Sequence, residues 1–199
     1  MIIGWLIDNI LWIGLVLLAL SAISGRRGLS GLGWVLFGVH WLKQPAYYLA
    51  IGDPFNVVLT LVVALFCFYV GWLILARRCR SRSCDWAGTA VAIGGFAYFP
   101  FAEIAPLRDW LILMTAKLTL LLLAAFDVPA MTGGGSVITL NGHSVEIVLA
   151  CTAIESMALF AGVVLSVRAP LKRKAAALLV SVPVIYALNL FRNTFVVVA

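Results

Sequence analysis

A cysteine and an arginine stand out in the apolar C-terminal third of this chain. Cys151 lies within the stretch "EIVLACTAIESMALF", and Arg192 lies within "NLFRN". A thiolate is a strong nucleophile, and a guanidinium beside a thiol favours the thiolate form. The same guanidinium can stabilise the oxyanion that forms when a thiolate attacks a peptide carbonyl. The two residue types therefore predict covalent chemistry at a carbonyl group.

Helical spacing places these two residues at one depth. Cys151 precedes Arg168 by seventeen residues, and Lys174 precedes Arg192 by eighteen; these spacings correspond to about 26 Å and 27 Å along a helix. If the two segments are consecutive antiparallel helices, Cys151 and Arg192 lie at the same level, far from the basic stretch that joins them. A charged residue inside an apolar segment is a candidate functional residue by default.

Three polar residues accompany this pair. Asn189 and Asn193 flank Arg192 at helical spacing, and Glu155, four residues after Cys151, shares its face of the helix. We interpret all three as supporting residues, with Glu155 as a structural partner rather than a base. Simpler interpretations stay open: Cys151 as a small packing residue, and Arg192 as the partner of Glu155 in a salt bridge between helices.

A second set of residues yields weaker hypotheses. His143 precedes Cys151 by eight residues, so a Cys–His dyad is possible, although a surface histidine in a turn is the interpretation we prefer. Cys79 and Cys84 flank "CRSRSC" without histidine or further cysteine nearby, which argues against a zinc site. We therefore expect neither a metal nor a cofactor.

The composition defines the class of protein. Of the 199 residues, 64% are hydrophobic and 11% are charged, whereas about a quarter are charged in a typical soluble domain. The net charge of +6 comes largely from three short stretches, "GRRG", "ARRCRSR" and "RAPLKRK". Basic loops between apolar runs are typical of the cytoplasmic side of a membrane protein, so we do not expect nucleic-acid binding.

We predict an all-α polytopic membrane protein with six to seven hydrophobic helices. A membrane span needs about 20 apolar residues, and the first apolar run is expected to be a retained helix with its N-terminus outside. The candidate segments are Ile3–Ala22, Leu32–Ile51, Phe55–Ala76, Trp86–Ile104, Leu107–Phe126, Leu149–Val167 and Ala175 to the last residue.

One of these segments must not cross the membrane. Three segments separate the second and third basic stretches, yet two loops on the same side require an even number of crossings. We favour Leu107–Phe126 as a helix in the outer interface, anchored by Arg108, Asp109, Trp110 and Lys117. The alternative is that Trp86–Ile104, interrupted by "GG" and Pro100, is a re-entrant segment covered by protein or water.

A β-hairpin is predicted just before the cysteine. The stretch "GSVITLNGHSVEIV" alternates around Asn141 and Gly142, a strong signal for a two-residue type I′ turn. Because an unpaired hairpin cannot lie in hydrocarbon, we expect it on the extracytoplasmic surface, spanning about Ser136–Val148 and shielding the mouth of the Cys151 site.

The C-terminal part of the chain resembles the exosortase/archaeosortase family, in particular its archaeosortase A branch. The matching stretches are "VEIVLACTAIESMALFAG", "VRAPLKRKAAALLVSVPVIYALNLFRN" and, more loosely, "PLRDWLILMTAKLTLLLLAAFDVPAMTGGGSVITLNG". The resemblance implies one multi-pass membrane domain, in which residues 1–105 supply N-terminal helices and residues 106–199 the catalytic core.

The resemblance also implies site residues and an activity. Cys151 matches the family's nucleophile, which forms an acyl-thioester, and Arg192 matches its essential arginine, assigned as a proton donor. Because arginine keeps its proton, hydrogen-bond donation to the thiolate or oxyanion fits the chemistry better. The family's third catalytic basic residue, an arginine or histidine, is expected on a later helix beyond Ala199, so this chain is expected to end before it.

The implied activity is that of a cysteine transpeptidase in the cell membrane, with its active site near the extracytoplasmic face. Its partners would be exported surface proteins with a C-terminal tripartite signal: a short Pro-Gly-Phe type motif, a transmembrane helix and a basic tail. A membrane lipid would accept the new C-terminus. The alternatives are an intramembrane cysteine protease that releases a free carboxylate, and a non-enzymatic membrane subunit or transporter in which Arg192 binds an ion or headgroup.

Overall fold

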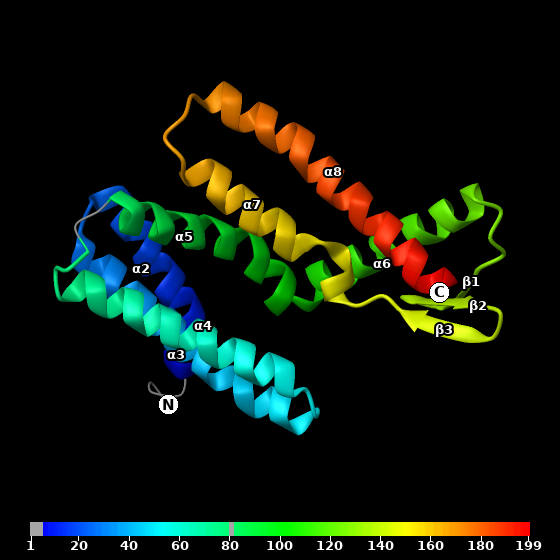
Figure 1. Ribbon diagram of the computed structural model, residues 1–199, viewed down its shortest axis with the longest axis horizontal. Helices are drawn as coiled ribbons and strands as arrows, with labels where there is room; N and C mark the ends of the chain where they lie inside the picture. Colours follow the sequence, from blue (N-terminus) through cyan, green and yellow to red (C-terminus); the bar gives the residue numbers. More distant parts are fainter. Residues whose placement is uncertain (1–5, 80–81) are drawn as a thin grey trace. The chain divides into compact units, whose positions relative to one another are not determined.

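The computed structural model describes residues 6–79 and 82–199. Arg80 and Ser81 of the second basic stretch, and the first residues of the first apolar segment, lie outside the described residues. The chain forms two compact units, one up to Ile93 and the other Gly94–Ala199 (Figure 1). Each unit is described by itself.

Each predicted apolar segment contains a helix. The helices of the first unit are α2 (Ile10–Ser24), α3 (Arg27–Ala50) and α4 (Pro54–Leu75), and α5 (Arg82–Glu103) continues into the second unit. The second unit also holds α6 (Ala105–Ala125), β1 (Met131–Gly134), β2 (Val137–Leu140), β3 (His143–Glu146), the 3₁₀ helix η1 (Leu149–Thr152), α7 (Ile154–Ser166) and α8 (Leu171–Val198).

Glycines allow the helices of the first unit to pack closely. A Cβ added at Gly33 of α3 would lie 2.8 Å from Cγ of Leu18 in α2. A Cβ at Gly71 of α4 would lie 2.9 Å from Cγ2 of Val35 in α3. Small residues at such contacts let two backbones approach within a membrane. The middle helix α3 therefore packs against both neighbours through small residues.

The connections at the two ends of α4 are locally stabilised. Asp53 caps its first turn, because the carboxylate accepts hydrogen bonds from the backbone N–H of Asn56 at 3.1 Å and from its Nδ2 at 2.6 Å. These hydrogen bonds lower the pKa of Asp53 below its usual range. After α4, Cys79 and Cys84 form a disulfide that closes the connection to α5.

The helices differ in how well they suit a membrane. Within the described residues, α4 and α8 are long and apolar enough to span one.

The predicted interruption of α5 is wrong, because α5 is continuous from Arg82 to Glu103 and Pro100 lies in its last turn. The helix α7 has 13 residues, or about 20 Å, less than the predicted Leu149–Val167.

The predicted hairpin is present. Strands β2 and β3 are antiparallel, and Leu140 pairs with His143 across the turn. Asn141 and Gly142 have φ values of 50° and 84°, and positive φ at both positions defines the type I′ turn. The expectation of a hairpin alone is wrong, because β1 extends it to a three-stranded sheet in the order β1-β2-β3. The β1 sequence "MTGG" lacks the alternation that would have revealed it.

One face of this sheet builds the core of the second unit. Ile138 and Leu140 of β2 are buried and pack with Ala116 and Leu123 of α6 and Val197 of α8. The alternation along β2 therefore separates a buried face from a more exposed one. This core anchors the sheet at the C-terminal end of α8, where Figure 1 shows it.

The two helices that contact α8 do so differently. Figure 1 shows α7 running alongside α8 and α6 crossing it. Thr115 of α6 hydrogen-bonds Tyr186 of α8, and the rings of Phe126 and Phe191 lie 6.4 Å apart. On the α6 side, these two contacts are eleven residues apart, about 16 Å along a helix. On α8 they are five residues apart, about 7 Å. The axis of α6 is therefore strongly inclined to that of α8.

Candidate functional site

Cys151 lies on a turn that precedes α7 rather than within a continuous helix. It belongs to η1, and Ala153 then adopts the left-handed conformation with φ of 60° before α7 begins at Ile154. The prediction of a helix from Leu149 is therefore wrong for its first turn. The chain changes direction immediately after the thiol, and the N-terminus of α7 is at Ile154 rather than at Cys151.

The backbone of Cys151 is bound to α8. Its carbonyl oxygen accepts a hydrogen bond from Nδ2 of Asn189 at 2.6 Å and another from Nδ2 of Asn193 at 2.8 Å. Both asparagine side chains are buried. Because Arg192 lies on the same turn of α8, the structure brings Cys151 to the level of Arg192, as the helical spacing predicts.

Cys151 is a free cysteine and is partly exposed. Cys79 and Cys84 are bonded to each other, and Cys67 is 1% exposed in α4. Cys151 is partly buried, and its side chain packs against the edge of the core cluster that contains Ile147 and Val197. Of the four cysteines, Cys151 is therefore the one whose thiol a reagent or substrate reaches most readily.

Arg192 is exposed on α8, whereas Asn189, Asn193, Thr194 and Val197 form the buried face of that helix. Within the described residues, no carboxylate forms an ion pair with Arg192. A guanidinium in an apolar helix needs a polar partner. Its lack of an acidic neighbour in this part of the chain leaves its donors available to a ligand.

The alternative interpretation of Arg192, a salt bridge with Glu155, is not seen among the described residues. Glu155 instead accepts a hydrogen bond from the Tyr98 hydroxyl of α5 at 3.2 Å. The break at Ala153 explains the difference, because it removes the continuous helix on which Glu155 and Cys151 were expected to share a face. Glu155 therefore links α7 to α5, and convergence of the Cys151 and Arg192 side chains stays a prediction.

His143 lies away from Cys151. It is exposed at the start of β3, beside the hairpin turn. The opposite end of β3, at Glu146, leads into the Cys151 turn. The length of β3, three residues or about 10 Å, therefore lies between His143 and the segment that leads to Cys151. This position fits a surface histidine rather than a member of a dyad.

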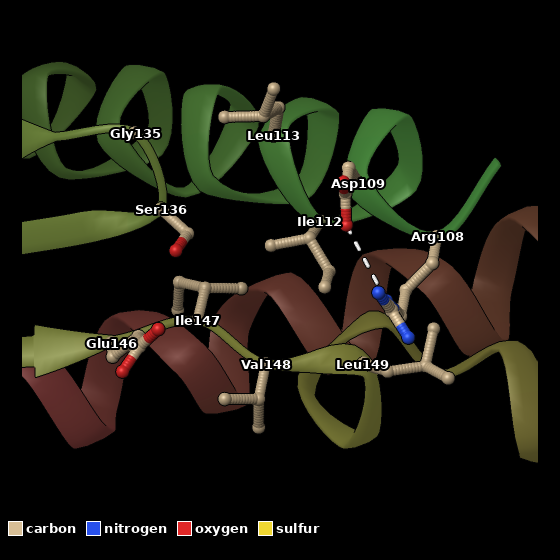
Figure 2. Close-up of a pocket in the computed structure, with 10 residues that line it drawn as sticks. All are labelled: Arg108, Asp109, Ile112, Leu113, Gly135, Ser136, Glu146, Ile147, Val148 and Leu149. Atoms are coloured by element: carbon tan, nitrogen blue, oxygen red, sulfur yellow. Dashed lines mark hydrogen bonds and ion pairs between the residues drawn. The ribbon is translucent and has the colours of Figure 1, made fainter. Parts of the chain in front are cut away.

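A cavity of about 440 Å³ lies next to the Cys151 turn (Figure 2). The first turns of α6, the β1–β2 turn and the segment between β3 and η1 line it. Figure 2 shows the Arg108 side chain reaching from α6 toward Leu149, with Asp109 beside it at 3.4 Å. The lining residues are Arg108, Asp109, Ile112, Leu113, Gly135, Ser136, Glu146, Ile147, Val148 and Leu149.

The cavity was not predicted from the sequence. Arg108 and Asp109 were predicted only as interfacial anchors, and the β1–β2 turn was not predicted. Glu146 begins the apolar stretch around the cysteine, and its charge was the one feature of that stretch that indicated a polar wall for a cavity. Within residues 6–79 and 82–199, no group of three or more histidine, cysteine or acidic residues is placed to hold a metal.

The comparisons with known proteins give the class of this one. Residues 1–199 match the family model described as transmembrane exosortase, Exosortase_EpsH, and the chain belongs to this family. It is 31% identical over 223 residues to archaeosortase A of Haloferax volcanii, covering 98% of this chain and 72% of that protein. It is also 31% identical over 192 residues to archaeosortase A of Natronomonas pharaonis, covering 90% of this chain and 60% of that protein. No solved structure matches the chain.

Proposed function

We propose that this chain carries the nucleophile of a membrane-embedded cysteine transpeptidase that processes exported proteins at a C-terminal sorting signal. The observation that carries the proposal is the position of Cys151. Its free thiol lies on a turn whose carbonyl is bound by Asn189 and Asn193 of α8, at the level of Arg192. Membership of the transmembrane exosortase family and the two archaeosortase A relatives support the reaction class.

The proposed reaction has two steps. In the first step, the Cys151 thiol gives its proton to solvent and the thiolate attacks the scissile carbonyl carbon; the C–N bond then breaks to leave an acyl-thioester, and the departing amine takes a proton from solvent. In the second step, a protonated nucleophile on a membrane lipid attacks the thioester, the C–S bond breaks, and the proton lost by the lipid nucleophile restores the thiol. Arg192 keeps its proton and donates hydrogen bonds to the thiolate and to the oxyanion of each intermediate.

The cavity supplies a place for the substrate near the nucleophile. The segment from Glu146 to Leu149 lines it and continues directly into η1, which contains Cys151. We propose that the short motif beside the scissile bond binds here, between α6 and this segment. The walls combine apolar side chains with Arg108, Asp109, Ser136 and Glu146, a mixture that is typical of peptide and small-ligand sites.

The proposed orientation places the Cys151 site near the extracytoplasmic face. The basic stretch from Arg168 to Lys174 joins the opposite ends of α7 and α8, and positively charged loops favour the cytoplasm. The steep inclination of α6 to α8 supports the interpretation that Leu107–Phe126 does not cross. The Cys79–Cys84 disulfide favours the other orientation, since such bonds are rare in the cytoplasm; we give more weight to the three basic stretches.

Trapping the intermediate tests the proposal. The protein in membranes is mixed with a substrate that carries a C-terminal sorting signal, and the mixture is denatured in acid to preserve thioesters. Mass spectrometry should find the substrate acyl group on Cys151, and hydroxylamine should release it. The absence of any acyl group on Cys151 while the substrate is still cleaved would reject the proposal. The product then separates the two enzyme classes, because transfer yields a lipid-modified C-terminus and hydrolysis a free carboxylate.

A further inference from the structure

The break before α7 leaves the Cys151 carbonyl without its usual partner. In a continuous α-helix, this oxygen would accept a hydrogen bond from the N–H four residues later, that of Glu155. Here Ala153 is left-handed, and α7 begins with the bond from the Met157 N–H to the Ala153 carbonyl at 3.0 Å. A buried backbone carbonyl almost always has a hydrogen-bond partner.

Two side chains from successive positions on α8 replace that partner. Asn189 and Asn193 lie four residues apart, so their amides reach the carbonyl from adjacent turns. Their side chains are 9% and 3% exposed. Asparagine is a poor residue for a helix interior, so helix stability does not explain two of them on the buried face of an apolar helix. The double contact with one oxygen does.

The contact ties the nucleophile to the helix that carries Arg192. Arg192 lies between the two asparagines in sequence, within a single turn of α8. We propose that Asn189 and Asn193 are positioning residues, which hold the Cys151 turn on α8 so that the thiol and Arg192 keep one relative placement during catalysis. This inference rests on the proposed role of Cys151 as the nucleophile.

The test uses the protein in membranes and three variants: Asn189→Leu, Asn193→Leu and the double leucine variant. Thr194→Val is the matched control, because Thr194 is buried on the same face but bonds only the Leu190 carbonyl of its own helix, at 2.9 Å. The rate of thioester formation at saturating substrate should fall about 10-fold for each single change and about 100-fold for the double change, as for a misplaced catalytic group. KM should stay near the wild-type value, and Asn193→Gln, which keeps an amide, should recover part of the rate.

A second measurement reads the hydrogen bonds without any substrate. Cysteine labelled with ¹³C at its carbonyl gives a signal for Cys151, which is assigned by its loss in Cys151→Ala. This signal should move upfield in Asn189→Leu and Asn193→Leu, because a hydrogen-bond donor deshields the carbonyl carbon and each variant removes one donor. It should not move in Thr194→Val. Alkylation of Cys151 by iodoacetamide should persist in every variant that keeps the thiol.

The outcomes separate the two proposals. A wild-type rate of thioester formation in the double leucine variant would overturn the positioning role, even if the carbon signal moved. An equal loss of rate in Thr194→Val, or a loss expressed only in KM, would do the same. Substrate processing by Cys151→Ala would instead reject Cys151 as the nucleophile and leave the carbonyl contact itself intact.

Discussion

Asn193 donates its side-chain amide to the carbonyl of Cys151 over 2.8 Å, although 42 residues separate the two along the chain. This contact joins the turn before α7 to the last part of α8. It sets the level of the free thiol on α8 through a bond to the backbone carbonyl rather than to the sulfur. The backbone of Cys151 is therefore held by a contact that does not engage the thiol.

Replacing Cys151 should abolish processing. Cys151→Ala removes the nucleophile, and Cys151→Ser leaves a hydroxyl that needs a general base. The Tyr98 hydroxyl, rather than Cys151, contacts Glu155, the nearest carboxylate along the chain. Cleavage of a signal-bearing substrate in membranes is the measurement. Cys67→Ala is the control, because that buried thiol lies in α4 of the first unit, and a similar loss there would point to instability instead.

Changes at Arg192 should be graded. Arg192→Ala should lower the rate of processing by at least about 10²–10³-fold, the typical cost of one oxyanion donor. Arg192→Lys keeps the charge but loses the planar fork of donors, so we expect a severe but smaller loss. Arg168→Ala, an exposed arginine beyond the other end of α7, serves as control. If all three variants behaved alike, Arg192 would be a structural or topological residue.

The left-handed conformation of Ala153, two residues after Cys151, predicts different effects for glycine and proline. Ala153→Gly should change the free energy of unfolding by less than about 1 kcal/mol, because relief of left-handed strain roughly offsets the added freedom of the unfolded chain. Ala153→Pro fixes φ near −65° and should destabilise by about 3 kcal/mol or more. Chemical unfolding in detergent measures both. Tolerance of proline would mean that Ala153 does not hold the conformation described here.

Close helix packing in the first unit predicts opposite effects on stability when alanine replaces two different glycines. Gly71→Ala places a Cβ 2.9 Å from Val35 Cγ2 and should destabilise the protein by about 1–3 kcal/mol. Gly28→Ala meets nothing within 4 Å and should stabilise by about 0.5–1 kcal/mol, the helix preference of alanine over glycine. Thermal unfolding of the two variants in one detergent compares them directly. Equal effects would contradict the α3–α4 contact.

The orientation predicts labelling from opposite sides of the membrane. His143→Cys at the hairpin turn should react with an impermeant maleimide from the extracytoplasmic side, and Arg168→Cys should react only after the membrane is opened. Both native residues are exposed, and Cys151→Ala provides a background without the reactive thiol. Labelling of both cysteines from one side would show that α7 does not cross. The reverse pattern would favour the orientation that the Cys79–Cys84 disulfide suggests.

Much of the architecture follows from local sequence. Runs of about 20 apolar residues are typical of membrane-spanning helices, and each predicted segment contains a helix. The Asn141–Gly142 turn was equally predictable, because the type I′ turn demands positive φ at both positions and these two residues accept it. Fixed rise per residue also gave the common level of Cys151 and Arg192.

The tertiary structure alone decided how the Cys151 turn is held. Alanine is the strongest helix former, so nothing local in "LACTAIES" predicts the break at Ala153. That break forms where the displaced Cys151 carbonyl finds Asn189 and Asn193, which follow it by 38 and 42 residues. Strand β1 depends in the same way on distant partners, since "MTGG" has no strand pattern of its own and pairs with β2. Local preference yields wherever a buried polar group gains a partner that only the folded chain supplies.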